Sequence, residues 1–191
     1  MIQPNSVTLF PATAALIALL GTVLLLSACA GYDPDDPNLP QTVPHVDLDR
    51  YVGQWYEIAR YDNRFQKECV ASTAEYILRS DGKIEVINRC RKNTVDGKLK
   101  ESRGKAWVVD KTSNARLKVQ FFWPFRGDYW IIDLDEEKYT YAVVGHPSRQ
   151  YLWVLARSPR LDAAVYAGIL QRLEAQRYDT SRLKQYPPAT E

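Results

Sequence analysis

The sequence predicts an all-β protein, an eight-stranded up-and-down antiparallel β-barrel with one C-terminal α-helix packed on the outside. Three observations predict this fold. Short β-rich runs follow one another between turn signals at a spacing of about 8–12 residues. Only one stretch, near the C-terminus, has helical periodicity. The 5 Trp, 12 Tyr and 5 Phe residues supply large rings to bury. Eight antiparallel strands in sequence order close most economically into a barrel, whose outer wall the helix can cover.

The strands are justified by their turn signals. The first strand is expected at residues 54–61. A hairpin at residues 74–78 and 83–88 flanks Asp81-Gly82, a strong hairpin signal, and a second Asp-Gly at Asp96-Gly97 ends the strand that holds Cys90. The remaining strands are a long one that runs towards Val109, followed by residues 115–122, 128–134, 139–144 and 151–157, which are separated by Gly, Pro and acidic residues.

The single helix is predicted from spacing. Leu161, Val165, Ile169 and Leu173 recur every four residues in a stretch that ends at Ala175. Ser158-Pro159 precedes it and is expected to provide the cap and a proline near the first turn.

Composition excludes several functions. The 191 residues are 46% hydrophobic and 25% charged, as in a globular protein with one core. Lys and Arg number 25 against 23 Asp and Glu, so the net charge of +2 gives no large field for attracting nucleic acid. Two His and three Cys are too few and too scattered for a zinc site. We expect no cofactor, no metal and no nucleic-acid partner, and a monomer or weak homodimer.

The amino-terminal segment predicts export. Residues 12–28 are all apolar or small, and no charged side chain precedes Asp33. At about 17 residues, this stretch is at the lower limit for crossing a bilayer, so residues 1–28 are interpreted as a signal peptide, with an uncleaved transmembrane anchor as the alternative. Its ending, Leu26-Ser27-Ala28-Cys29, resembles the bacterial lipobox. That resemblance implies cleavage before Cys29 and a lipid anchor, such as palmitate, on this residue.

Between the anchor and the body, residues 29–45 contain four prolines with aspartates among them. This composition favours an extended, solvated tether. The globular body is expected at residues 46–186, followed by a short tail at residues 187–191.

Three segments together resemble the signature regions of the lipocalins. They are Gly-Gln-Trp-Tyr-Glu-Ile-Ala-Arg at residues 53–60, the stretch from Gly127 to Pro147, and Tyr-Leu-Trp-Val-Leu-Ala-Arg-Ser-Pro at residues 151–159. Their order and spacing are most similar to the bacterial outer-membrane lipoprotein lipocalins and their relative apolipoprotein D. The resemblance implies a lipid-anchored binding protein of the outer membrane, with its body facing the periplasm and a role in envelope maintenance, and not an enzyme.

Some residues are predicted to be structural. An indole from the first strand under a guanidinium from the last would close one end of the barrel by stacking, worth about 1–2 kcal/mol, and Trp55 and Arg157 are the candidates. Gly53 permits the turn where the chain enters the barrel. Cys69 and Cys90 lie on the two sides of the first hairpin, and an oxidising compartment would let them pair. A bulge would be needed because Cys69 is about four positions out of register; the alternative is two buried thiols.

Strand alternation predicts an aromatic and aliphatic lining for one long-chain lipid, a fatty acid or a lysophospholipid. The apolar run at residues 121–125 is expected to form the mouth or a surface that touches the membrane. Arg60, Arg64, Lys67 and Arg126 are expected near the open end, where they would meet a head group or form a solvated rim. The predicted ligand-binding residues are Tyr76, Asn88, Val119, Phe121, Phe125, Arg126, Tyr129, Trp153 and Leu155.

Three alternatives remain open from the sequence. The barrel could be solid and the protein structural. Glu57 or Tyr129 could act as a catalytic group on a bound lipid if its pKa were strongly shifted, although the chain has no hydrolase or phosphate-binding motif. The lining would also suit a planar aromatic ligand such as a porphyrin.

Overall fold

The computed structural model describes residues 36–189. The predicted signal peptide and the lipidation site at Cys29 lie outside the described residues. Within the described part, no helix is long and apolar enough to cross a membrane.

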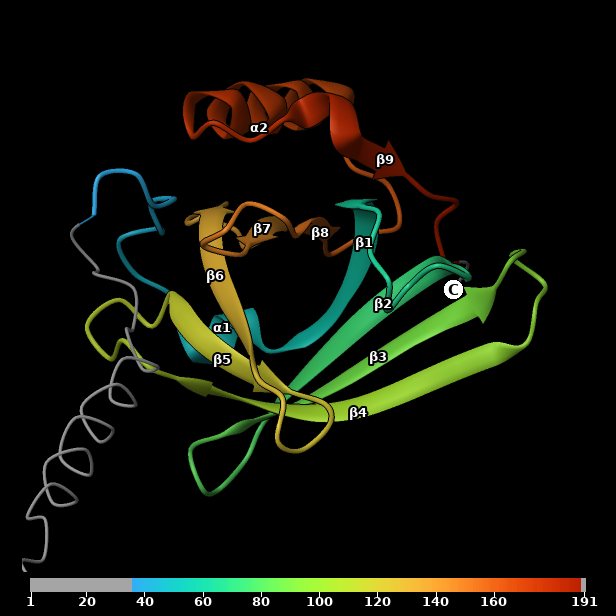
Figure 1. Ribbon diagram of the computed structural model, residues 1–191, viewed down its shortest axis with the longest axis horizontal. Helices are drawn as coiled ribbons and strands as arrows, with labels where there is room; N and C mark the ends of the chain where they lie inside the picture. The colour runs from blue at the N-terminus through green and yellow to red at the C-terminus, as the bar shows by residue number, and fades with distance from the viewer. Residues whose placement is uncertain (1–35, 190–191) are drawn as a thin grey trace, which may run out of the picture. The chain divides into compact units, whose positions relative to one another are not determined.

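The body is a closed antiparallel barrel (Figure 1). The strands pair in the order β2-β3-β4-β5-β6-β7-β8-β1, and β1 also pairs with β2, which closes the sheet. This confirms the predicted eight-stranded barrel. The strands are β1 (Gly53–Tyr61), β2 (Cys69–Leu78), β3 (Ile84–Lys92), β4 (Leu99–Val108), β5 (Arg116–Gln120), β6 (Gly127–Leu134), β7 (Tyr141–Gly145) and β8 (Leu152–Ala156).

Three short elements were not predicted. A one-turn helix, α1 (Leu48–Tyr51), precedes β1, and the Asp47 side chain caps it by accepting from two backbone N–H groups. A short 3-10 helix, η1 (Thr180–Arg182), leads into β9 (Leu183–Gln185), which pairs with the end of β1 outside the closed barrel.

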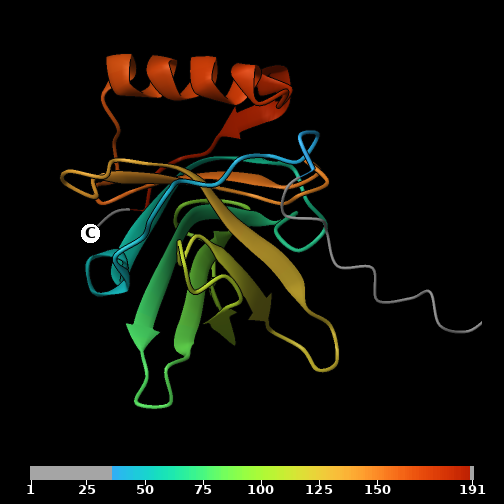
Figure 2. The ribbon, with the colours of Figure 1, turned by 90° about the vertical axis from the view of Figure 1, so that its left-hand side faces the viewer.

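The predicted helix is α2 (Ala163–Ala175), which lies across the outside of the barrel (Figure 2). Its Ile169 and Leu173 pack on outward residues of β1, β6, β7 and β8. The predicted cap is wrong: Asp162, not Ser158, accepts from the N–H groups of Ala164 and Val165. Asp162 immediately precedes the first helical turn, whereas Ser158 lies four residues earlier and donates to the carbonyl of Arg160.

The segment before α1 differs from the expected solvated tether. Val43 and Val46 are buried, and their N–H groups donate to the carbonyls of Ile131 and Ser113 at 3.0 and 2.7 Å. Leu39 packs against the cluster under α2, and Pro40 is buried. The apolar residues between the prolines explain this, because an extended chain can still cover a barrel wall and bond to backbone groups there. From Leu39 onward, the segment is therefore part of the packed body.

The antiparallel order places the connecting loops at two ends. Loops 62–68, 93–98, 121–126 and 146–151 follow β1, β3, β5 and β7 and share one end, called here the open end. Loops 79–83, 109–115 and 135–140 lie at the other end with α1 and are called here the closed end. The core fills the barrel between them and includes Trp55, Tyr76, Val86, Leu117, Val144 and Leu155.

Candidate functional site: the barrel interior and its two ends

The closed end is sealed by an indole and a guanidinium. The Trp55 side chain is fully buried, and its Nε1 donates to the carbonyl of Tyr51 at 2.8 Å. The guanidinium carbon of Arg157 lies 3.8 Å from the Trp55 ring centroid, in the stacked arrangement expected from the sequence. Arg157 also donates to four backbone carbonyls, those of residues 50, 51, 52 and 54, at 2.6–3.1 Å.

Gly53 makes this seal possible. Its φ of +95° is in the region that favours glycine, and a Cβ there would lie 3.4 Å from Nη1 of Arg157. The chain therefore turns into β1 directly beneath the guanidinium.

Above the seal, three tyrosine hydroxyls form a chain. Tyr51 and Tyr129 are 2.7 Å apart, oxygen to oxygen, and Tyr129 donates to Tyr76 at 2.9 Å. Burial raises the pKa of Tyr76 to about 12 and raises the pKa of the other two phenols as well. The phenols therefore stay neutral near pH 7. The raised pKa keeps Tyr129 protonated, whereas a general base would have to be deprotonated.

Most predicted lining residues face the interior. Tyr76 and Leu155 are buried in the core, while Val119, Phe121, Tyr129 and Trp153 pack against it and stay partly exposed. Phe121 lies close to Gly104, where an added Cβ would come within 2.8 Å of its ring. Asn88 pairs with Ala74 and Ser102 in the sheet and is exposed.

Two predicted ligand residues lie apart from this group. Phe125, in loop 121–126, is 76% exposed. The Arg126 guanidinium lies 5.4 Å from the ring centroid of Trp107, which alternates with the inward Ala106 and therefore faces outward. The structure thus places Phe125 and Arg126 on the rim and outer wall.

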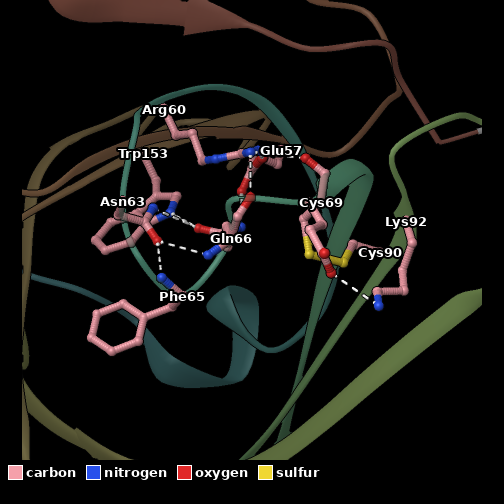
Figure 3. Close-up of a disulfide and its surroundings, with 10 residues drawn as sticks. Glu57, Arg60, Asn63, Phe65, Gln66, Cys69, Cys90, Lys92 and Trp153 are labelled. Atoms are coloured by element: carbon pink, nitrogen blue, oxygen red, sulfur yellow. Dashed lines mark hydrogen bonds and ion pairs between the residues drawn. A yellow bond between two sulfur atoms is a disulfide. The ribbon is translucent and has the colours of Figure 1, made fainter.

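A buried polar network lies under the open end (Figure 3). Glu57 and Arg60 form an ion pair and are only 6% and 1% exposed. Gln66 connects the pair to the interior wall: its Nε2 donates to Glu57 at 2.7 Å, and its Oε1 accepts from Trp153 Nε1 at 2.9 Å. Sequence reasoning missed this network.

Arg60 is consequently not the rim charge that the sequence suggested. A register shift between Glu57 and Ala59 reverses the alternation of β1, so that Ala59 faces outward and Arg60 pairs with the inward Trp153. Its guanidinium also donates to the carbonyls of Gln66 and Cys69 at 3.1 and 2.8 Å.

The predicted disulfide is confirmed. Cys69 and Cys90 are bonded, with their Cα atoms 5.4 Å apart. The β2–β3 register shifts between Val70 and Thr73, which is the irregularity that the sequence required. Because Cys69 follows loop 62–68 directly, the disulfide fixes that loop to β3 beside the polar network (Figure 3).

Two hollows of the described surface lie outside the barrel interior. One, of about 390 Å³, is lined by Arg64, Lys67, Tyr186 and neighbouring residues of loop 62–68. The other, of about 250 Å³, lies on the outer faces of β1, β2 and β3 and includes Val95, Leu99 and Ala189. Neither contains a predicted ligand-binding residue.

An up-and-down barrel that Trp55 and Arg157 close at one end, and that is lined by apolar side chains, is the architecture of small-molecule binding proteins. Comparison with known proteins leads to the same class of protein. The model of the Lipocalin-like domain matches residues 46–188. The chain belongs to the lipocalin family.

Its relatives include bacterial lipoproteins. It is 38% identical to outer membrane lipoprotein Blc of Vibrio cholerae, over 87% of this chain and 95% of that protein. It is 40% identical to the Blc protein of Escherichia coli K12, over 87% and 92%. Apolipoprotein D of Macaca fascicularis is 29% identical over 84% and 92%. The crystal structure of lobster apocrustacyanin A1 is similar with a TM-score of 0.61 and 19% identity, covering 75% of this chain and 81% of that one.

Proposed function

We propose that this lipocalin is a lipid-anchored outer-membrane protein that binds and carries a long-chain lipid, a fatty acid or a lysophospholipid. Cys29 would carry the anchor, and the body would face the periplasm. The names of the bacterial relatives, outer membrane lipoprotein, and the Leu-Ser-Ala-Cys motif support the anchor and the location.

One observation carries the ligand proposal. Val119, Phe121, Tyr129 and Trp153 face the interior between the sealed floor and the open end, and all four remain partly exposed. An acyl chain would cover this surface. About fourteen methylenes at roughly 0.8 kcal/mol each give a gross gain near 11 kcal/mol, which ordering costs reduce to about micromolar affinity or tighter.

The polarity of the interior supports a head group at the open end. The floor presents tyrosine hydroxyls that bond to one another, and a second polar group, the buried network of Glu57, Arg60 and Gln66, lies towards the open end. Arg64 and Lys67, beside the hollow of about 390 Å³, supply positive charge just outside. A lipid with one acyl chain and a polar head fits this arrangement.

Native mass spectrometry of the full chain, purified in detergent and then released, tests the proposal. We expect one oleate or lysophospholipid adduct per chain, lost in Trp153→Ala and in the space-filling Val119→Trp. The matched control, Trp107→Phe on the outer face, should keep the adduct. A folded protein that takes up neither lipid would contradict the proposal.

The anchor is tested separately. The mass of the processed N-terminus should show a diacylated and palmitoylated cysteine, and Cys29→Ser should move the protein out of the outer-membrane fraction. An unmodified Cys29 in the mature protein would refute the anchor without affecting ligand binding.

A solid barrel with a structural role is the second candidate. It is favoured by the two hollows, both of which lie outside the interior. Absence of any adduct in the experiment above would favour it. Catalysis on a bound lipid is the least supported function, because the Glu57 carboxylate is already bonded to Arg60 and Gln66. Turnover of a bound lipid that is lost in Glu57→Gln would support catalysis.

A further inference from the structure

Exposed aromatic rings collect at the open end. Phe122, Trp123 and Phe125, in loop 121–126, are 72%, 85% and 76% exposed. Phe65 in loop 62–68 is 58% exposed, and Val95 in loop 93–98 is 43% exposed. Among the large apolar side chains exposed in the described chain, every aromatic one lies at this end. Folding alone does not explain such a cluster, because it leaves the rings in water.

The charges around the rings favour an anionic partner. In loop 62–68 the two acids are paired, Asp62 with Lys184 at 2.6 Å and Glu68 with Lys92 at 2.9 Å. No ion pair is formed within the described residues by Arg64 or Lys67 of the same loop. Arg126 flanks the aromatic loop with its guanidinium over Trp107. The Arg64 guanidinium lies 4.9 Å from the ring centroid of Phe65. Aromatic rings bordered by cations that are not neutralised by ion pairs are the arrangement that binds at the interface of a negatively charged bilayer.

The described chain begins near this end. The side chain of Asn38 accepts from Arg177 at 3.4 Å, just after α2, and Figure 2 shows the first described residues, in blue, beside that end of the helix. The carbonyl of Gln176 accepts from Arg149, in loop 146–151, at 2.8 Å. His146, in that loop, lies 3.8 Å from Asp128, which follows the aromatic loop by two residues.

The position of the anchor limits how far the body can lie from the membrane. Six residues lie between Cys29 and residue 36, which makes seven residue-to-residue steps. Even fully extended, these steps reach only about 25 Å at about 3.6 Å per residue. A lipid on Cys29 would therefore hold the open-end side of the body close to the membrane that carries the anchor.

We propose that loop 121–126 inserts its three aromatic rings into the interface of an anionic phospholipid bilayer, so that the mouth of the barrel opens onto the membrane surface. The inference rests on the proposed anchor and ligand function and extends it, because a lipid would enter the barrel from the leaflet without crossing water. The alternative is that a second copy of this chain covers the same three rings.

The experiment uses the full chain in vesicles of phosphatidylethanolamine with a minority of phosphatidylglycerol, in which the acyl chains are brominated to quench tryptophan. The emission of Trp123 is obtained as the difference between the protein and Trp123→Phe. We expect brominated vesicles to remove most of this emission. Phe122→Ser should lower the ratio of docked to undocked loop about tenfold and restore emission, because one ring no longer leaves water. The matched control, Val109→Ser at the closed end, should change nothing.

Three results would overturn the inference. Unquenched Trp123 in brominated vesicles means that the loop stays in water. A blue shift of Trp123 in detergent that grows with protein concentration means that a second copy covers it. Equal quenching by one brominated fatty acid per chain in detergent places a bound ligand, and not the bilayer, beside the ring. Failure of the underlying function would be seen separately, in the N-terminal mass and in the lipid adduct of the same sample.

Discussion

The two ends of the barrel are held by different kinds of interaction. At the closed end, Arg157 bonds to four backbone carbonyls and covers a fully buried Trp55. At the open end, Gln66 makes side-chain bonds from a loop, and three neighbouring aromatic rings stay in water. The carbonyls belong to α1, the residue after it and the start of β1, so they cannot move without disturbing those elements, whereas a loop side chain can change rotamer. The contrast assigns stability to one end and adaptability to the other.

The largest effect is expected at the closed end. Trp55→Ala should lower the free energy of unfolding by about 3–5 kcal/mol, because a fully buried indole leaves a cavity and Arg157 loses its stacking partner. Urea denaturation followed by circular dichroism measures it. Trp107→Ala, at a partly exposed outward site, should cost clearly less. Equal losses would remove the distinction.

The disulfide is an exception to this contrast between the two ends, because it holds part of the open end with a covalent bond. Its residues are 21 apart in sequence, so replacing both cysteines by alanine should lower the free energy of unfolding by about 3 kcal/mol through the added freedom of the unfolded chain. Reduction of the unaltered protein should give the same urea midpoint. A midpoint that reductant leaves unchanged would show that the disulfide adds no stability.

Gln66→Ala tests the adaptable end. We expect a loss of about 1–2 kcal/mol in unfolding free energy, because Glu57 and Trp153 lose a buried partner. Lipid exchange, followed by the fluorescence of a labelled fatty acid, should become faster. Gln150→Ala, at an exposed position in loop 146–151, serves as the control. Slower exchange would mean that Gln66 does not restrict access to the barrel.

The smallest effect concerns pH. Burial lowers the pKa of His146 in spite of the opposing charge of Asp128. The unfolded chain therefore takes up the proton first as the pH falls through about 6.5, and stability declines until the pH is below the lowered folded value. Unfolding free energy measured across this range should fall with acidification, and the fall should be smaller in His146→Gln. If the unfolding free energy of His146→Gln fell with pH as steeply as that of the unaltered protein, groups other than His146 would cause the fall.

The sequence predicted the features that follow from local patterns. Eight strands came from turn signals and alternation, and the Cys69–Cys90 bond came from hairpin register with an allowance for a bulge. Features that depend on breaks in alternation could not be found in this way. The shift after Glu57 turns Arg60 inward, and no local signal in the sequence announces it.

Short elements were missed for a different reason. β9 has three residues, fewer than a periodic pattern needs, and it exists because the edge of β1 is available to pair with it. α1 has four residues, although Asp47 ahead of it is a readable capping signal. The prolines before α1 suggested solvated chain, and only the tertiary fold shows that Val43 and Val46 reach the barrel. The ligand set remains a prediction.

The seal at the closed end also has a consequence for biosynthesis. The bonds of Arg157 join residues 103–107 positions apart, so the barrel cannot close until the last strand has been made and exported. Until then, β1 lacks β8, and two strand edges are open to pairing with other chains. Contacts this distant in sequence also slow folding. A chain cut short before Arg157 should therefore aggregate or be degraded, and folding of the body must be a late step that follows translocation.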